Sequence, residues 1–179
     1  TSAGYGWPMT DPVGRNSERD LVATFLSAAA SATSVLSIEG EAGIGKTTLC
    51  NYCIAEARES GTLVLSCHPS AAESPMSFAG LTDLLAGLDE TAFDVLPAPQ
   101  RRALAIATLR EEPSGTPPHE RAIGTALQTL VGSLAASAPI VIVLDDAHWL
   151  DRASAEVVGF ALRRLSGVPV GVLTSRRPG

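Results

Sequence analysis

Basic charge is scarce in this sequence. Its 179 residues include 13 lysines and arginines against 19 aspartates and glutamates, which gives a formal net charge of −6. Binding to a nucleic-acid backbone requires clustered lysine and arginine side chains. We therefore expect no direct nucleic-acid binding by this domain, and any DNA contact must come from another part of a parent protein.

Long hydrophobic runs are also missing. No apolar stretch approaches the roughly 20 residues of a transmembrane helix, although 45% of the residues are hydrophobic, as in a globular protein. Residues 1–11 have neither the basic start nor the apolar centre of a signal peptide. We expect a cytoplasmic protein with no membrane partner, a flexible lead-in over residues 1–11 and one domain over residues 12–179.

Cysteine occurs only three times, as Cys50, Cys53 and Cys67. Cys50 and Cys53 have the spacing of a zinc or redox pair, but no second ligand pair is well placed for a metal. They also fall three residues apart on a predicted helix. We interpret them as small, partly buried thiols in a reducing compartment.

Lysine occurs once, as Lys46, and it stands in a glycine-rich loop. The loop matches the pattern G-x-x-x-x-G-K-[ST] in full, after a predicted strand and at the start of a predicted helix. Its glycines let consecutive backbone N–H groups point at phosphate oxygens, and the helix N-terminus adds partial positive charge. The predicted nucleotide-binding residues are Gly40, Glu41, Ala42, Gly43, Ile44, Gly45, Lys46, Thr47 and Thr48.

Three side chains of this loop have predicted roles. Lys46 would contact the β- and γ-phosphates, the Thr47 hydroxyl would bind Mg2+, and Thr48 would donate to the α-phosphate. The other 12 basic residues are all arginine. Lysine is retained where a compact ammonium fits between phosphate oxygens and a planar guanidinium does not. The predicted ligands are ATP or ADP with Mg2+.

A second motif is a pair of aspartates after an apolar run. Residues 140–144 contain no polar side chain, which is typical of a strand buried on both faces in a parallel sheet. Carboxylates at the C-terminal end of such a strand lie on the ligand-binding edge. Asp145 would hold Mg2+ directly or through water, and Asp146 would orient the attacking water as a catalytic residue with Lys46. The alternative is that both aspartates only begin a turn.

The order of predicted elements defines a fold class. Strands are predicted over 34–38, 62–66, 140–144 and 168–174, and helices over 21–30, 46–58, 77–88, 99–109, 120–136 and 151–165. Their alternation predicts an α/β, three-layer P-loop NTPase fold with a mostly parallel central sheet and right-handed crossovers. A segment with three prolines over 111–118 is predicted to be an exposed loop.

Weaker signals surround these motifs. Arg176 ends the last predicted strand and either senses the γ-phosphate or is an ordinary solvated charge. Arg15 precedes the first helix and would lie near the nucleotide. His148 and Trp149 follow the aspartates and either report the nucleotide state to a partner or pack under the sheet edge.

The motifs together resemble the STAND group of signalling P-loop ATPases, and most closely the ATPase region of large ATP-binding LuxR-type transcriptional regulators. The residues that carry the resemblance are Val13–Arg15 with Glu18, Gly40–Thr47, Ser77–Leu81, Leu96–Arg101, Asp145–Glu156 and Thr174–Arg176. The resemblance implies that the last strand inserts between the P-loop strand and the Asp145 strand. It also implies a switch in which ATP replaces ADP and slow Mg2+-dependent hydrolysis resets the molecule.

The sequence stops before the last core strand, the lid and the C-terminal helix-turn-helix of such a regulator. The expected partners are therefore the nucleotide and the other domains of the parent protein. Two alternatives stay open. An AAA+-like loader or remodeller would require an arginine finger and usually has Asp-Glu in place of Asp145-Asp146. A non-hydrolysing scaffold would hold ADP as a structural ligand.

Overall fold

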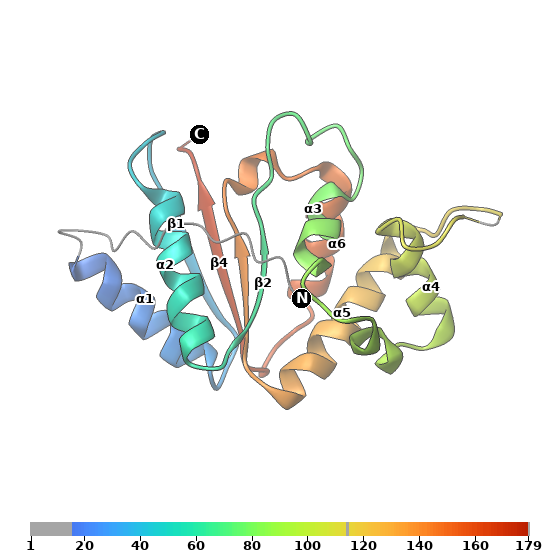
Figure 1. Cartoon of the computed structure of the whole chain (residues 1–179), viewed down its shortest axis with the longest axis horizontal. Helices are drawn as coiled ribbons and strands as arrows, with labels where there is room; N and C mark the ends of the chain where they lie inside the picture. The colour runs from blue at the N-terminus through green and yellow to red at the C-terminus, as the bar shows by residue number, and fades with distance from the viewer. Residues whose placement is uncertain (1–15, 114, 179) are drawn as a thin grey trace.

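Four parallel strands form the central sheet of the molecule (Figure 1). The computed structural model describes residues 16–113 and 115–178. The strands are β1 (Ser34–Glu39), β2 (Leu63–Cys67), β3 (Ile140–Leu144) and β4 (Val170–Arg176). They lie in the order β1-β4-β3-β2, and each neighbouring pair is parallel. The predicted α/β class with a parallel sheet is confirmed, and β4 inserts between β1 and β3 as the resemblance implied.

Helices cover both faces of this sheet (Figure 1). One face is covered by α1 (Asn16–Ala29) and α2 (Lys46–Glu59). The other is covered by α3 (Ala79–Leu85), α5 (Glu120–Ser137) and α6 (Arg152–Leu162), with α4 (Ala98–Ala107) packed outside on α5. Two short 3-10 helices, η1 (Glu90–Val95) and η2 (Ala147–Trp149), complete the described elements. None of the helices within the described ranges is long and apolar enough to cross a membrane.

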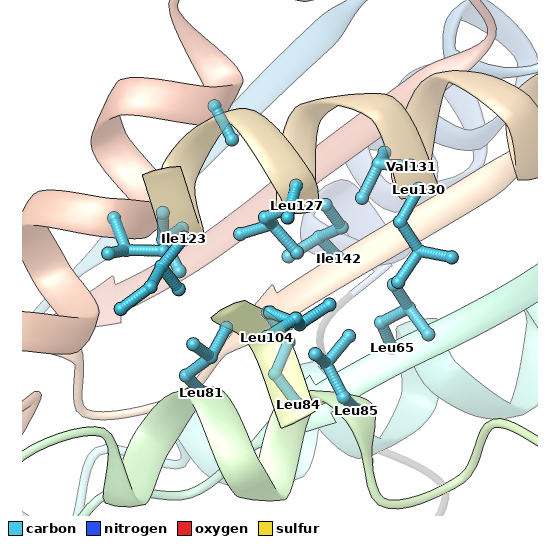
Figure 2. Packing of buried hydrophobic residues seen from close by; sticks show 14 of the residues in the cluster. Leu65, Leu81, Leu84, Leu85, Leu104, Ile123, Leu127, Leu130, Val131 and Ile142 are labelled. Atoms are coloured by element: carbon cyan, nitrogen blue, oxygen red, sulfur yellow. The ribbon is translucent and has the colours of Figure 1, made fainter. Parts of the chain in front are cut away.

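Strand β3 divides its side chains between two hydrophobic cores. Ile140, Ile142 and Leu144 belong to the larger core, whose leucines from α3, α4 and α5 surround Ile142 in Figure 2. Val141 and Val143 belong to the smaller core beneath α1 and α2. All five residues are buried, as the apolar run predicted. The strand is thus packed on both sides and fixes the position of the aspartates that follow it.

Two boundaries differ from the sequence prediction. Helix α3 begins at Ala79 rather than at residue 77, because Phe78 adopts a left-handed conformation with φ of 65° and cannot continue a helix. Strand β4 runs to Arg176 rather than to residue 174, since it pairs with β1 as far as Glu39. The second difference extends the sheet edge at which the glycine-rich loop begins.

Candidate nucleotide-binding site

The glycine-rich loop connects β1 to α2. Gly43 and Gly45 have φ values of 80° and 92°, in the left-handed region that glycine adopts without strain. A methyl group added at Gly43 would meet no atom within 4 Å, so this part of the loop faces open space. Gly45 is the N-cap of α2 and provides no side chain to cap it. The first N–H groups of the helix are therefore without a capping side chain and suited to an anion.

The single lysine folds back across this loop. Lys46 is only 7% exposed, and its Nζ donates to the carbonyl oxygens of Gly40 and Glu41 over 2.8 and 3.0 Å. An ammonium group carries three N–H donors. Two of them are used by the loop, which leaves one for a phosphate oxygen in the position the sequence predicted.

Asp145 is the most heavily hydrogen-bonded side chain of the site. It is 3% exposed, and its Oδ1 accepts from the Ser175 hydroxyl and from the backbone N–H of Asp146. Its Oδ2 lies 3.3 Å from His68 Nδ1. Burial by itself raises the pKa of this carboxyl, but the hydrogen bonds from His68, Ser175 and Thr47 outweigh it and hold the pKa well below its usual value. The group is therefore a carboxylate at neutral pH.

The two predicted Mg2+ ligands lie together. Thr47, on the exposed first turn of α2, hydrogen-bonds through its hydroxyl to the Asp145 carboxylate at the end of β3. A hydroxyl and an ionised carboxylate are hard oxygen ligands of the kind that Mg2+ prefers. The side chains in the structure therefore fit the ion that the sequence predicted here.

Asp146 turns away from the core after Asp145. It adopts a left-handed conformation with φ of 48°, which aspartate tolerates better than most residues. Its N–H is held by Asp145 Oδ1 at 3.1 Å and by Ser175 Oγ at 2.8 Å. Its carboxylate is 35% exposed and lies 3.9 Å from His148 Nδ1. The acidic group is thus accessible to water while its backbone is fixed.

The two predicted arginines stand differently. The Arg176 guanidinium pairs with Glu39, with Nε 2.7 Å from the carboxylate, and the Arg176 carbonyl accepts the N–H of Gly40 over 3.3 Å. Its side chain thus lies beside the first residue of the loop. Arg15 lies outside the described residues. His148 and Trp149 both lie in η2, with their ring centroids 5.0 Å apart.

Two residues around Asp145 were not given these contacts by sequence reasoning. Ser175 lay within the strand end considered for γ-phosphate sensing, but its buried contact with Asp145 was not foreseen. His68 was not considered at all. Both contacts depend on which strands are neighbours, and the ladder pairs Cys67 with Leu144 immediately before His68.

The three cysteines are free, buried thiols. Cys50 Sγ lies 3.6 Å from Asp145 Oδ1, and burial, followed by the nearby carboxylate, raises the pKa of this thiol above its ordinary range. Burial likewise raises the pKa of Cys53 and of Cys67 to about 12. The thiols therefore stay protonated at neutral pH and pack as small apolar groups.

Two of the motif stretches meet in a structural bracket beside the site. Asp151 caps α6 by accepting the N–H of Ser154 at 2.9 Å, and it also accepts the N–H groups of Phe78 at 2.8 Å and Gly80 at 3.0 Å. The Ser154 hydroxyl accepts the N–H of Leu81 at 2.8 Å. Helix α3 thus has its N-terminal N–H groups satisfied by side chains of α6. The bracket fixes the segment that follows the two aspartates.

A phosphate-binding loop between a strand and a helix, with a buried carboxylate two strands away in the sheet, defines the P-loop NTPase class. A family model for an AAA ATPase domain matches residues 11–173, which is most of the chain. The chain therefore belongs to the AAA ATPase domain family, and it is a nucleotide-binding domain of that family. No curated protein matches the chain.

Proposed function

We propose that this chain is an ATP-binding and slowly ATP-hydrolysing switch domain of the STAND group, in a cytoplasmic LuxR-type transcriptional regulator. One observation carries the nucleotide part of the proposal. Thr47 and the buried, ionised Asp145 are hydrogen-bonded to each other beside the loop that holds Lys46. The regulator part rests on the resemblance of the motif stretches, above all the run Asp145–Asp151.

The chain's own groups divide the work of binding. The N–H groups of Gly40–Thr48 and the Lys46 ammonium would hold the phosphates, with Thr48 on the α-phosphate. Thr47 and Asp145 would hold Mg2+ on the adjoining side. When bound, Mg2+ would neutralise charge that develops on the β- and γ-phosphate oxygens. Arg15 would complete the nucleotide pocket from the segment before α1.

Asp146 would act on water rather than on the phosphates. Its carboxylate is 35% exposed while its backbone N–H is anchored at 2.8 Å to Ser175. A carboxylate held this way would orient a water molecule for in-line attack. Aspartate is one methylene shorter than the glutamate usual in fast motor ATPases, which supports slow turnover and hence a switch.

Arg176 would read the γ-phosphate by exchanging partners. In the structure it is paired with Glu39, immediately before the loop, and both side chains are about half exposed. An exposed ion pair of this kind contributes little stability, so a phosphate oxygen can compete for the guanidinium. The partners that receive this signal would be the other domains of the parent protein, and DNA contact would belong to its helix-turn-helix.

The test compares binding and turnover in three proteins. We expect Asp146→Asn to bind Mg-ATP within about threefold of the wild type, yet to hydrolyse it at least about a hundredfold more slowly, as for loss of a water-orienting group. Asp94→Asn, an exposed carboxylate on η1, is the matched control and should hydrolyse ATP at the wild-type rate. Normal hydrolysis by Asp146→Asn would exclude the water-orienting role.

The same assay separates the two alternatives. A hydrolysis rate per molecule that rises steeply with protein concentration would indicate an arginine finger from a neighbouring molecule, as in a loader or remodeller. Bound ADP that does not exchange with added ATP would indicate a structural ligand. The switch requires exchange together with a rate that is independent of protein concentration.

A further inference from the structure

His68 lies directly opposite Asp145 at the carboxyl edge of the sheet. It is the first residue after β2, whose last residue Cys67 is in register with Leu144. The ladder continues one step further, since the N–H of Asp145 donates to the Cys67 carbonyl over 3.1 Å. The two side chains that follow therefore belong to neighbouring parallel strands. The backbone register brings them together, and an exposed loop does not.

The two oxygens of Asp145 face different surroundings. Oδ1 is turned into the protein, where it accepts from the fully buried Ser175 and from the N–H of Asp146. Oδ2 lies 3.3 Å from His68 Nδ1, and the histidine side chain is 42% exposed. Oδ2 is thus on the solvent side of the carboxylate. That is the side from which a nucleotide-bound cation would approach.

The direction of this hydrogen bond follows from the charge of Asp145. The carboxylate has a lowered pKa and is ionised, so it only accepts hydrogen bonds. His68 Nδ1 must therefore carry the proton and donate to Oδ2. A carboxylate oxygen has two lone pairs, so Oδ2 accepts from His68 with one and keeps the other for a ligand.

We propose that His68 is a positioning residue for Asp145, holding Oδ2 toward the Mg2+ of a bound nucleotide and thereby setting the affinity of the site for Mg2+. The inference rests on the proposed nucleotide-binding function. Ser175 fixes Oδ1, and His68 fixes Oδ2, so the plane of the carboxylate is held from both sides. Loss of a hydrogen-bonding partner behind a metal ligand typically weakens metal binding about 10–100-fold.

The test is isothermal titration of ADP into the full chain, in EDTA and over a series of Mg2+ concentrations. For His68→Ala we expect the Mg2+ concentration that half-saturates the tightening of ADP binding to rise about tenfold or more. The affinity for ADP in EDTA should stay at the wild-type value. Asparagine places its amide nitrogen near the position of Nδ1, so His68→Asn should restore the Mg2+ midpoint to within about threefold.

His119→Ala provides the matched control. This histidine caps α5, accepting the N–H of Arg121 at 3.1 Å, and should leave the Mg2+ midpoint unchanged. An unchanged midpoint in His68→Ala would overturn the positioning role. So would an equal loss of ADP affinity with and without Mg2+, which is the result of a merely structural role. A wild-type chain whose ADP binding does not depend on Mg2+ would instead refute the proposed function, and the positioning role with it.

Discussion

The backbone N–H of Asp146 donates to the buried Ser175 hydroxyl over 2.8 Å. The same hydroxyl donates to Asp145 Oδ1. One side chain at the end of β4 therefore holds both aspartates that follow β3. Because β4 lies between β1 and β3, the strand order of the sheet is tied directly to the geometry of the candidate site.

Replacing Ser175 tests this link. Ser175→Ala removes the hydroxyl that joins the two aspartates, and we expect the free energy of unfolding to fall by about 1–3 kcal/mol, as for a buried hydrogen-bonding group that loses its partner. The measurement is denaturant unfolding at pH 7. The control is Ser37→Ala on β1, an exposed serine contacted by Thr174 Oγ1 at 3.4 Å, which should change stability by less than about 0.5 kcal/mol. Equal effects of the two substitutions would contradict the account.

Asp151 should be a major determinant of stability. It is 2% exposed and accepts three backbone N–H groups from α3 and α6. Asp151→Asn replaces one acceptor oxygen by a donor and weakens the rest by removing the charge, so we expect a loss of about 2–3 kcal/mol at pH 7. The exposed carboxylate Asp94, paired with Arg101, serves as the control, and Asp94→Asn should cost at most about 1 kcal/mol.

The effect of Asp151 should depend on pH in a defined direction. Burial raises the pKa of Asp151, but hydrogen bonds from Ser154, Gly80 and Phe78 outweigh it and lower the pKa. A carboxyl with a lowered folded-state pKa stabilises the fold above its unfolded value of about 3.9, and this contribution is lost as the pH falls through the folded-state pKa. The difference in unfolding free energy between wild type and Asp151→Asn should therefore be full above about pH 5 and shrink below about pH 4. A pH-independent difference would show that charge plays no part.

Two glycines should respond in opposite directions to alanine. A Cβ at Gly171 in β4 would lie 2.7 Å from Ala29 Cβ and 2.8 Å from Phe25 Cζ, so helix α1 would have to move away from the sheet. We expect Gly171→Ala to cost about 1–3 kcal/mol. A Cβ at Gly132 in α5 would meet only Leu165 Cδ2, at 3.7 Å, and Gly132→Ala should gain up to about 1 kcal/mol. Thermal or denaturant unfolding of the two variants measures both, and a stabilising Gly171→Ala would refute the close packing of α1.

Arg176 should matter for nucleotide discrimination and little for stability. Its pairing with Glu39 is exposed, so Arg176→Ala should change the unfolding free energy by less than about 1 kcal/mol. The ratio of ATP affinity to ADP affinity should fall, because only ATP offers a γ-phosphate. Arg101→Ala, which breaks the exposed pair with Asp94, should leave that ratio unchanged. An unaltered ratio in Arg176→Ala would make the arginine an ordinary solvated charge.

The sequence was most informative where the chemistry is contiguous. The loop Gly40–Thr48 and the pair Asp145-Asp146 could be recognised because all their residues are neighbours in the chain, and the apolar run before Asp145 indicated a buried strand. Those local patterns predicted the α/β fold with its parallel sheet, which the structure confirms. The insertion of β4 between β1 and β3 came from the family resemblance alone.

What sequence could not provide depends on contacts between distant elements. His68 reaches Asp145 because β2 and β3 are neighbours, and Ser175 reaches it because β4 is the other neighbour. Asp151 was recognised as a helix cap, but its bonds to Phe78 and to the next turn require α3 and α6 to be packed together. Neither spacing nor composition contains that information.

The measurement that tests the central claim most directly is isothermal titration of ATP and ADP, with Mg2+, into the chain and into Lys46→Ala. Lys46 already donates to two loop carbonyls and has a further N–H for a phosphate. We predict that the wild-type chain binds both nucleotides and that Lys46→Ala loses at least about a hundredfold in affinity, as expected when hydrogen bonds from a charged group are removed. Lys46→Arg should not restore binding, because a planar guanidinium does not fit where the ammonium lies. Nucleotide binding by Lys46→Ala as tight as that of the wild type would contradict the account.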